Sequence, residues 1–274
     1  MTSETPEPAP AASQAPGGDS EPVLELRGIN KRFGAVQALT DIHLTVGRGE
    51  VVGLVGDNGA GKSTLIKVIA GVHAADEGDL VINGARQRFS SPKDAQKAGV
   101  ATVFQDLALC ENLDVVANLF LGHEKTRGPV LDEVAMEAKS WELLRSLSAK
   151  IPSVRVPIAA LSGGQRQTVA IARSLLGEPS LVMLDEPTAA LGVAQTAEVL
   201  NLIERLKERE LGVLLVSHNM ADVQAVADRV HVLRLGKDAG DFPGDERTDV
   251  LVAAITGASD NVVTQRAARR GERR

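Results

Sequence analysis

The octapeptide from Gly56 to Ser63 has the residue types of a loop that wraps around phosphate groups. Its sequence, GDNGAGKS, fits the pattern G-x-x-x-x-G-K-[ST] at every position. Glycines let successive backbone N–H groups converge on phosphate oxygens without a Cβ in the way. In this pattern Lys62 reaches the outer phosphates, while the Ser63 hydroxyl binds Mg²⁺. An apolar run before the loop and a helix predicted over residues 63–70 favour a bound nucleotide over a glycine-rich turn that binds nothing. The predicted nucleotide-binding residues here are Gly56, Asp57, Asn58, Gly59, Ala60, Gly61, Lys62, Ser63 and Thr64.

Two adjacent carboxylates follow a second apolar run. Leu181–Leu184 leads directly into Asp185 and Glu186, and the carboxyl ends of strands are where open α/β sheets place ligands. Asp185 is suited to hold Mg²⁺ through a water molecule, and Glu186 is suited to polarise an attacking water as a general base. An Asp-Glu pair usually marks a solvated turn, but the apolar run and the upstream phosphate loop argue against that alternative.

A second anion-binding motif lies about twenty residues before Asp185. Leu161–Gln165, with the sequence LSGGQ, offers the Ser162 hydroxyl and the backbone amides of Gly163 and Gly164, which we expect to be exposed. A helix predicted over residues 168–176 follows, and its N-terminal end favours anions. One nucleotide does not need two such motifs in one chain. We therefore expect the second motif to bind the nucleotide held by another copy.

In order and spacing, these three motifs resemble those of the ABC ATPases, over nearly all of residues 23–257. The resemblance implies ATP and Mg²⁺ as cofactors. It also implies that Phe33 stacks on adenine, that Gln105 contacts Mg²⁺ and senses a membrane partner, and that His218 contacts the γ-phosphate. The predicted catalytic residues are Lys62, Gln105, Glu186 and His218, the predicted metal ligands are Ser63, Gln105 and Asp185, and the predicted second-copy contacts are Ser162, Gly163, Gly164 and Gln165.

Within this family the chain is most similar to the ATPases of carbohydrate importers, in segments 104–115 and 187–193. Gly192 stands where most family members have Asp, which puts in doubt any contribution of a carboxylate there across a dimer. The resemblance implies a symmetric homodimer at the cytoplasmic face of the membrane. It also implies integral-membrane permease subunits as partners, an indirect partnership with an extracytoplasmic sugar-binding protein, and motion carried to the permease by residues 112–121.

The elements that must position these motifs alternate between extended and helical patterns. Continuous apolar runs at residues 51–55, 181–184 and 213–216 are typical of strands buried on both faces of a parallel sheet. The sequence predicts an α/β P-loop NTPase fold with a RecA-like parallel-sheet core. It also predicts an N-terminal antiparallel β subdomain with strands at 23–29 and 43–46, and an inserted α-helical subdomain at about 106–176. Helical periodicity over 132–147 predicts an apolar face with Val134, Trp141, Leu144 and Leu147.

Outside the ATPase domain at 23–257, residues 1–22 are expected to be a disordered tail. Residues 258–274 form a basic C-terminal tail that is either solvated or attracted to anionic lipid. The net charge of −6 and the 2% aromatic content argue against a nucleic-acid partner. Cys110, the only cysteine, excludes an internal disulfide and fits a reducing compartment. Three alternatives stay open: a transport ATPase for export or another substrate, a non-transport ABC ATPase acting on ribosomes or DNA, and a nucleotide-binding regulator without turnover.

Overall fold

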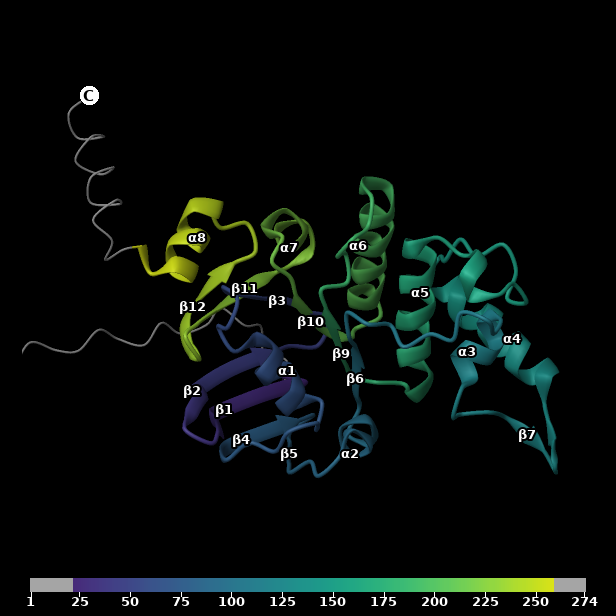
Figure 1. Cartoon of the computed structure of the whole chain (residues 1–274), viewed down its shortest axis with the longest axis horizontal. Helices are drawn as coiled ribbons and strands as arrows, with labels where there is room; N and C mark the ends of the chain where they lie inside the picture. The colour runs from purple at the N-terminus through teal and green to yellow at the C-terminus, as the bar shows by residue number, and fades with distance from the viewer. Residues whose placement is uncertain (1–21, 259–274) are drawn as a thin grey trace, which may run out of the picture.

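The computed structural model describes residues 22–258, and Figure 1 shows their arrangement in two sheets with helices around them. The two predicted tails therefore lie outside the described residues, apart from Pro22 and Ala258 at their inner ends.

The larger sheet has six strands in the order β12-β11-β3-β10-β9-β6. Strands β11, β3, β10, β9 and β6 are parallel, and only β12 runs antiparallel to its neighbour. The middle strands β3 and β10 are buried along their whole length, as their continuous apolar sequences predict. The carboxyl ends of the five parallel strands meet at one edge, and the phosphate loop, Gln105, the Asp185–Glu186 pair and His218 lie at the ends of four of them. The bounds are β3 Val51–Val55, β6 Val100–Val103, β9 Leu181–Asp185, β10 Gly212–Val216, β11 Arg229–Arg234 and β12 Lys237–Pro243.

The smaller sheet is antiparallel, with the order β2-β1-β4-β5. Its strands are β1 Leu24–Phe33, β2 Val36–Val46, β4 Glu77–Ile82 and β5 Ala85–Gln87. The first two are longer than predicted because a two-residue turn joins them, with Gly34 at φ +57° and Phe33 paired with Val36. The predicted antiparallel subdomain is present, but the sequence pattern missed this tight hairpin.

Helix α1 (Lys62–Ile69) lies between the two sheets (Figure 1). It buries Leu65, Ile66, Val68 and Ile69 in one core cluster with side chains of both sheets. The helix that begins at the phosphate loop is therefore held from two sides. Its position is fixed by packing along most of its length.

Three further helices, α6 (Val193–Glu208), α7 (Met220–Val226) and α8 (Thr248–Thr256), lie along the upper side of the large sheet in Figure 1. Short α2 (Pro92–Lys97) precedes β6. The teal segment at the right of the figure is mainly helical and contains α3 (Val115–Phe120), α4 (Glu133–Ser146), α5 (Gly163–Ser174) and the small hairpin of β7 (Thr126–Arg127) and β8 (Val130–Leu131). Two 3₁₀ turns, Ile158–Ala160 and Leu175–Gly177, flank α5.

Two sequence-based details of this helical segment are wrong. Helix α5 begins at Gly163, not Thr168, because Ser162 caps it and the glycines form its first turn. Val134 is 81% exposed and does not join the apolar face. Leu144 and Leu147 are buried as predicted, together with Met136 and Leu143, and Trp141 packs against the same cluster.

The predicted fold class is confirmed: a largely parallel sheet carries the phosphate loop, an antiparallel sheet packs across α1, and helices are inserted between β6 and β9. Among the helices within residues 22–258, none combines the length and the apolar character needed to cross a bilayer.

Candidate nucleotide site

The phosphate loop connects β3 to α1 and borders a cavity of about 390 Å³. Gly56 and Gly61 have φ values of +155° and +106°, and both are crowded. A Cβ on Gly56 would overlap the carbonyl oxygen of Leu233, and one on Gly61 would lie 2.8 Å from the Leu39 side chain. At these two positions the glycines are required by the close approach of neighbouring strands. The loop is therefore built to hold its backbone in one shape.

Lys62 folds back over the loop. Its Nζ donates hydrogen bonds to the carbonyl oxygens of Gly56 at 2.7 Å and Asp57 at 3.1 Å. Both bonds are to neutral acceptors, so phosphate oxygens carrying negative charge would be stronger partners for the ammonium group. The lysine thus lies at the loop with its charge not paired to a carboxylate in the described chain.

The acidic pair lies where the sequence predicts it, at the carboxyl end of β9. Burial raises the pKa of Asp185, and the neighbouring Glu186 raises it further, whereas Lys62 and Lys67 lower it. The influence of Lys62 on the pKa of Asp185 places this carboxylate within electrostatic reach of the phosphate loop. A bound cation would stabilise the charged form of Asp185 in the same way.

Glu186 has a left-handed backbone, with φ +52°. Its N–H donates to the carbonyl oxygen of Val216 at 2.9 Å, which holds it against the end of β10. Left-handed backbone costs a non-glycine residue roughly 1–2 kcal/mol, so local contacts must fix this turn. The result is that the Glu186 side chain, 15% exposed, faces the segment after β10.

That segment carries His218. Its Nδ1 lies 2.8 Å from Oε2 of Glu186, while the imidazole ring is 73% exposed. One ring nitrogen therefore contacts the Glu186 carboxylate, while most of the rest of the ring is exposed to solvent. This arrangement suits a histidine that holds a general base in place and can still contact a phosphate oxygen.

A second pair joins the same two segments. Thr188 Oγ1 donates to Oδ2 of Asp222 at 2.6 Å. Thr188 lies two residues after Glu186, and buried Asp222 lies in α7, the helix that follows His218. The sequence analysis missed this pair, because neither residue belongs to a motif. Its geometry ties the turn of Glu186 to the helix of His218.

Ser162 and Gln165 of the LSGGQ motif cap the N-terminus of α5. Ser162 Oγ accepts from the N–H of Gln165 at 3.2 Å, and Gln165 Oε1 accepts from the N–H of Ser162 at 3.0 Å. Gly163 is only partly exposed and Gly164 is buried, because Leu191 and Gln195 at the start of α6 pack against them. The expectation of two exposed glycine amides is therefore wrong for Gly164.

The structure does not bring all predicted residues together. Ser162, Gly163 and Gly164 do not line the cavity above the phosphate loop. Phe33 and Gln105 are outside it as well: Gln105 is exposed after β6, and the Phe33 ring packs edge-on against His73 with a centroid distance of 5.1 Å. Glu186 and His218 line a separate pocket. They follow β9 and β10, and β10 is also the neighbour of β3, the strand that leads into the phosphate loop.

Five residues that the sequence analysis did not single out line the same cavity. Val36, Gln37 and Ala38 enter from the hairpin after Phe33, and Leu235 and Gly236 enter from the turn between β11 and β12. The turn is held by the N–H of Gly236, which donates to Ala60. A Gly after Leu235 is a turn signal, but only the fold shows that this turn meets the phosphate loop.

The oxygen donors at this edge fit magnesium. Ser63 is exposed beside the loop, and the Asp185 carboxylate lies at the end of β9. Magnesium prefers hard oxygen ligands and usually takes most of them from water and phosphate. One hydroxyl and one carboxylate are therefore enough protein ligands for a Mg²⁺ ion that also binds water and phosphate.

Comparisons with known proteins agree with this geometry. The family model described as "ABC transporter" matches residues 39–189. A xylose/arabinose import ATP-binding protein of Sulfolobus acidocaldarius is 47% identical, over 78% of this chain and 86% of that protein. A fructose import ATP-binding protein of Rhizobium meliloti is 41% identical, over 88% of this chain and 96% of that protein.

Among solved structures, an ATP-binding cassette of an ABC transporter in its ADP conformation superposes with a TM-score of 0.75 and 26% identity, covering 90% of this chain and 98% of that one. The phosphate loop, the acidic strand, the histidine and these comparisons lead to one conclusion: the chain belongs to the ABC transporter family, as an ATP-hydrolysing ATP-binding cassette.

Proposed function

We propose that the chain powers an ABC importer for a monosaccharide, as a peripheral subunit at the cytoplasmic face of the membrane. The observation that carries this proposal is the similarity to pentose and fructose import ATP-binding proteins over most of the chain, combined with a complete set of catalytic groups. A regulator without turnover would not need Glu186 in contact with His218.

In the proposed mechanism two copies enclose two ATP molecules. Each nucleotide lies between the phosphate loop of one copy and Ser162, Gly163 and Gly164 of the other. The separation of the LSGGQ motif from the loop cavity within one chain supports this arrangement. Phe33 would stack on adenine and Gln105 would contact Mg²⁺. Closure of the two copies would exclude water from the site except for the attacking molecule.

Each catalytic group then has a defined task. Glu186 orients and deprotonates the attacking water, and His218 keeps Glu186 in place and contacts the γ-phosphate. Lys62 exchanges its two carbonyl partners for phosphate oxygens and stabilises their negative charge. Ser63 and Asp185 would hold Mg²⁺, which neutralises phosphate charge when bound.

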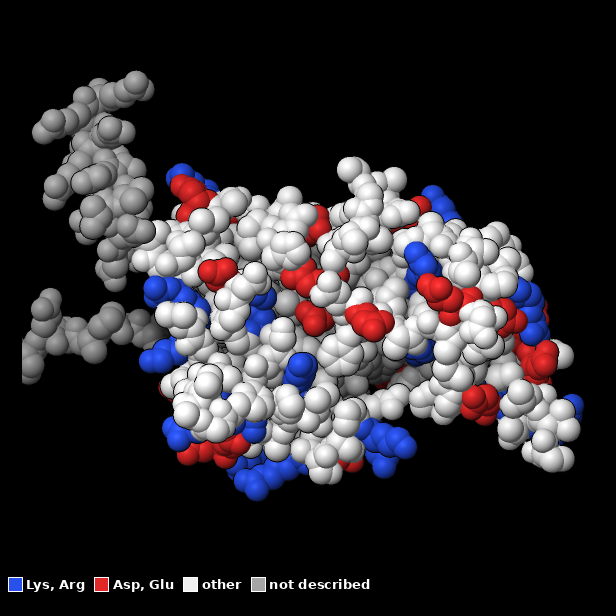
Figure 2. Space-filling model, viewed as in Figure 1, with Lys and Arg blue, Asp and Glu red and all other residues white. Residues whose placement is uncertain are grey.

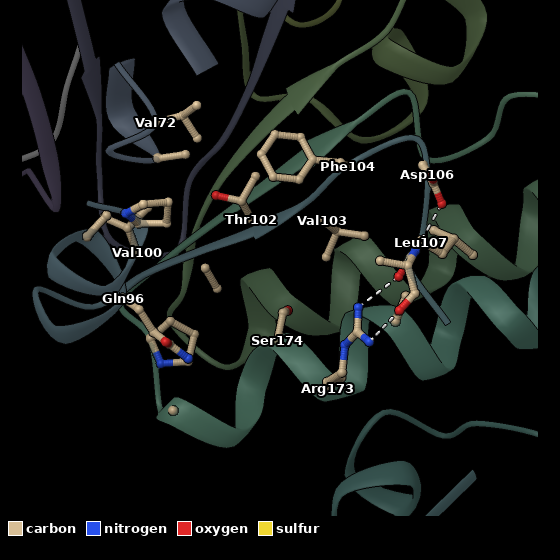
Figure 3. Close-up of a pocket in the computed structure, with 18 of the residues that line it drawn as sticks. Val72, Gln96, Val100, Thr102, Val103, Phe104, Asp106, Leu107, Arg173 and Ser174 are labelled. Atoms are coloured by element: carbon tan, nitrogen blue, oxygen red, sulfur yellow. Dashed lines mark hydrogen bonds between the residues drawn. The ribbon is translucent and has the colours of Figure 1, made fainter. Parts of the chain in front are cut away.

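A groove of about 340 Å³ supports a membrane partner for this subunit. It lies between α2, β6 and α5 (Figure 3), and the exposed apolar side chains of Val72, Phe104 and Leu121 line it. Lys93 and Lys97 are exposed on α2, the helix whose Ala95 and Gln96 line the groove. Figure 2 shows both basic and acidic side chains on the lower part of the molecule. An amphipathic cytoplasmic helix of the permease would fit such a groove.

Reconstitution tests the proposal. Membranes holding the chain together with its permease and sugar-binding protein should take up one of xylose, arabinose or fructose in an ATP-dependent manner. The Glu186→Gln chain should assemble equally well and support no uptake. Leu121→Asp should weaken co-purification with the permease, whereas Leu131→Asp, at a similarly exposed leucine on the β7–β8 hairpin, should not. Assembly that is unaffected by Leu121→Asp, or the lack of uptake of any sugar, would contradict the proposal.

A further inference from the structure

Arg173 joins the last turn of α5 to the loop that follows Gln105. Its Nη1 donates to the carbonyl oxygen of Ala108 at 2.9 Å, and its Nη2 donates to that of Leu107 at 2.7 Å. Figure 3 shows the guanidinium reaching up from α5 to both carbonyls at one end of the groove. Two parallel bonds from one planar group fix the loop in distance and in orientation.

The surroundings of Arg173 are unusual for an arginine. The side chain is partly buried, and within residues 22–258 it forms no ion pair with a carboxylate. Burial of an unpaired charge is costly unless hydrogen bonds compensate for it. The two loop carbonyls are therefore the groups that keep this cation in place. A surface arginine that only improves solubility would not be placed in this way.

The loop is shaped to present those carbonyls. Ala108 has a left-handed backbone, φ +48°, and its N–H donates to Oδ1 of Asp106 at 3.1 Å. The Asp106 side chain thus closes a short turn between Gln105 and the carbonyl that Arg173 contacts. A shift of Gln105 would move this turn, because only Asp106 and Leu107 separate Gln105 from Ala108.

The other end of α5 carries the LSGGQ motif. Ser162 caps the helix and Gly163 is its first residue, while Arg173 lies ten residues later. At a rise of 1.5 Å per residue, about 15 Å of rigid helix separates the two ends. Any displacement of the loop is therefore passed to Ser162 through one helix, without an intervening flexible joint.

We infer that Arg173 is a positioning residue that couples the Gln105 loop of one nucleotide site to the LSGGQ motif that completes the other. The inference rests on the shared-site dimer of the proposed function. In that dimer, Gln105 responds to the nucleotide on its own phosphate loop, while Ser162 of the same copy contacts the nucleotide of the partner. Arg173 links the two responses, so that hydrolysis becomes cooperative between sites.

Kinetics of the full chain, without permease or sugar, test this inference. Arg173→Met keeps the apolar stem and removes both donors. We expect ATP affinity to stay within about 2-fold and the Hill coefficient for ATP to fall toward 1. We expect kcat to fall at least about 10-fold, because a misplacement of about 1 Å caused far from the chemistry can lower a rate about 100-fold. Arg173→Lys should recover part of kcat, because one ammonium cannot bond both carbonyls as the planar fork does.

A double-mutant cycle distinguishes coupling from simple support of the fold. If Arg173 acts through the Gln105 loop, Arg173→Met and Gln105→Ala together should lower kcat by much less than the product of their separate effects. The matched control is Arg209→Met. Arg209, at the end of α6, also joins two segments through its guanidinium, which donates to Ser146 Oγ of α4 at 2.7 Å, but this contact does not involve the Gln105 loop. The factors by which Arg209→Met and Gln105→Ala each lower kcat should multiply in the double variant.

Multiplicative effects of Arg173→Met and Gln105→Ala, or an unchanged Hill coefficient, would overturn the inference. If the methionine variant does not fold, Arg173→Lys carries the same cycle. A different result would contradict the proposed function. A Glu186→Gln chain that stays monomeric with ATP and Mg²⁺ refutes the shared site. A chain that dimerises, but in which the effects of Arg173→Met and Gln105→Ala are multiplicative, refutes only the assignment of Arg173.

Discussion

Nδ1 of His218 lies 2.8 Å from Oε2 of Glu186, although the two residues follow different strands. Strands β9 and β10 are adjacent and parallel, so the residues after their carboxyl ends are neighbours. The pair exists because both strands end at the same level and the left-handed turn at Glu186 directs its side chain toward β10. The proposed catalytic pair therefore depends on the register in which β9 and β10 are paired.

Replacement of Glu186 by Gln should separate binding from chemistry. The amide cannot accept a proton from water, and general-base catalysis typically contributes about 10²–10⁴-fold. We expect phosphate release to fall at least about 100-fold, while ATP binding and ATP-dependent dimerisation persist. Phosphate-release assays and light scattering measure the two properties. Turnover at the original rate would mean that another group activates the water.

Substitutions at Ser162 should abolish turnover without affecting the phosphate loop of the same chain. Ser162→Arg should eliminate ATPase activity and also lose the helix cap, at about 1 kcal/mol. Ser162→Asp retains a capping side chain but directs negative charge at the partner's phosphates, so it should be inactive at nearly unchanged thermal stability. Calorimetric ATP affinity should stay the same in both variants. Loss of ATP binding by the monomer would show that Ser162 belongs to its own chain's site.

The stability of the chain should decline between neutral and mildly alkaline pH because of His231. Burial lowers the pKa of this histidine, but hydrogen bonds to Asp238 and Asp241 outweigh burial and raise the pKa to about 9. Its Nε2 and Nδ1 lie 3.1 Å from one carboxylate oxygen each. Only the protonated ring donates at both nitrogens. Arg229, paired with Asp241 and Glu50, is the other cation beside this group.

The pKa of His231 is higher in the folded state than the ordinary value of 6.5. Its contribution is therefore fully present below pH 6.5 and is lost as the pH rises through about 9, by at most about 3 kcal/mol. Urea unfolding at several pH values should show this decline, and His231→Gln should remove it. An equal pH dependence in the two proteins would assign the effect to other groups.

Two glycines of the phosphate loop should tolerate alanine very differently. At Gly56 a Cβ would overlap the backbone oxygen of Leu233, whereas at Gly59, with φ +81°, nothing lies within 4 Å of it. Gly59→Ala should therefore cost only the backbone strain, roughly 1–2 kcal/mol. Gly56→Ala should cost more, because β3 and β11 must separate. Chemical unfolding of both variants compares the costs, and equal destabilisation would contradict the crowding at Gly56.

The sequence was sufficient for the motifs and the parallel strands of the large sheet, because continuous apolar runs are typical of buried strands and the phosphate loop defines one turn. It did not predict the antiparallel edge strand β12. It was insufficient wherever distant segments meet. Nothing local to Thr188 or Asp222 indicates their hydrogen bond, and nothing near Leu235 indicates a place beside the phosphate loop. The early start of α5 was missed because glycines are poor helix formers. The cap formed by Ser162 and Gln165 outweighs that propensity.

The cap on α5 also limits what Ser162 can recognise. Its oxygen already accepts a hydrogen bond from the backbone N–H of Gln165, and the hydroxyl hydrogen stays free to be donated to an approaching group. A group rich in lone pairs, such as a phosphate oxygen, can accept that hydrogen bond. The capping arrangement of the free chain therefore already prepares Ser162 to bind a hydrogen-bond acceptor of a second molecule.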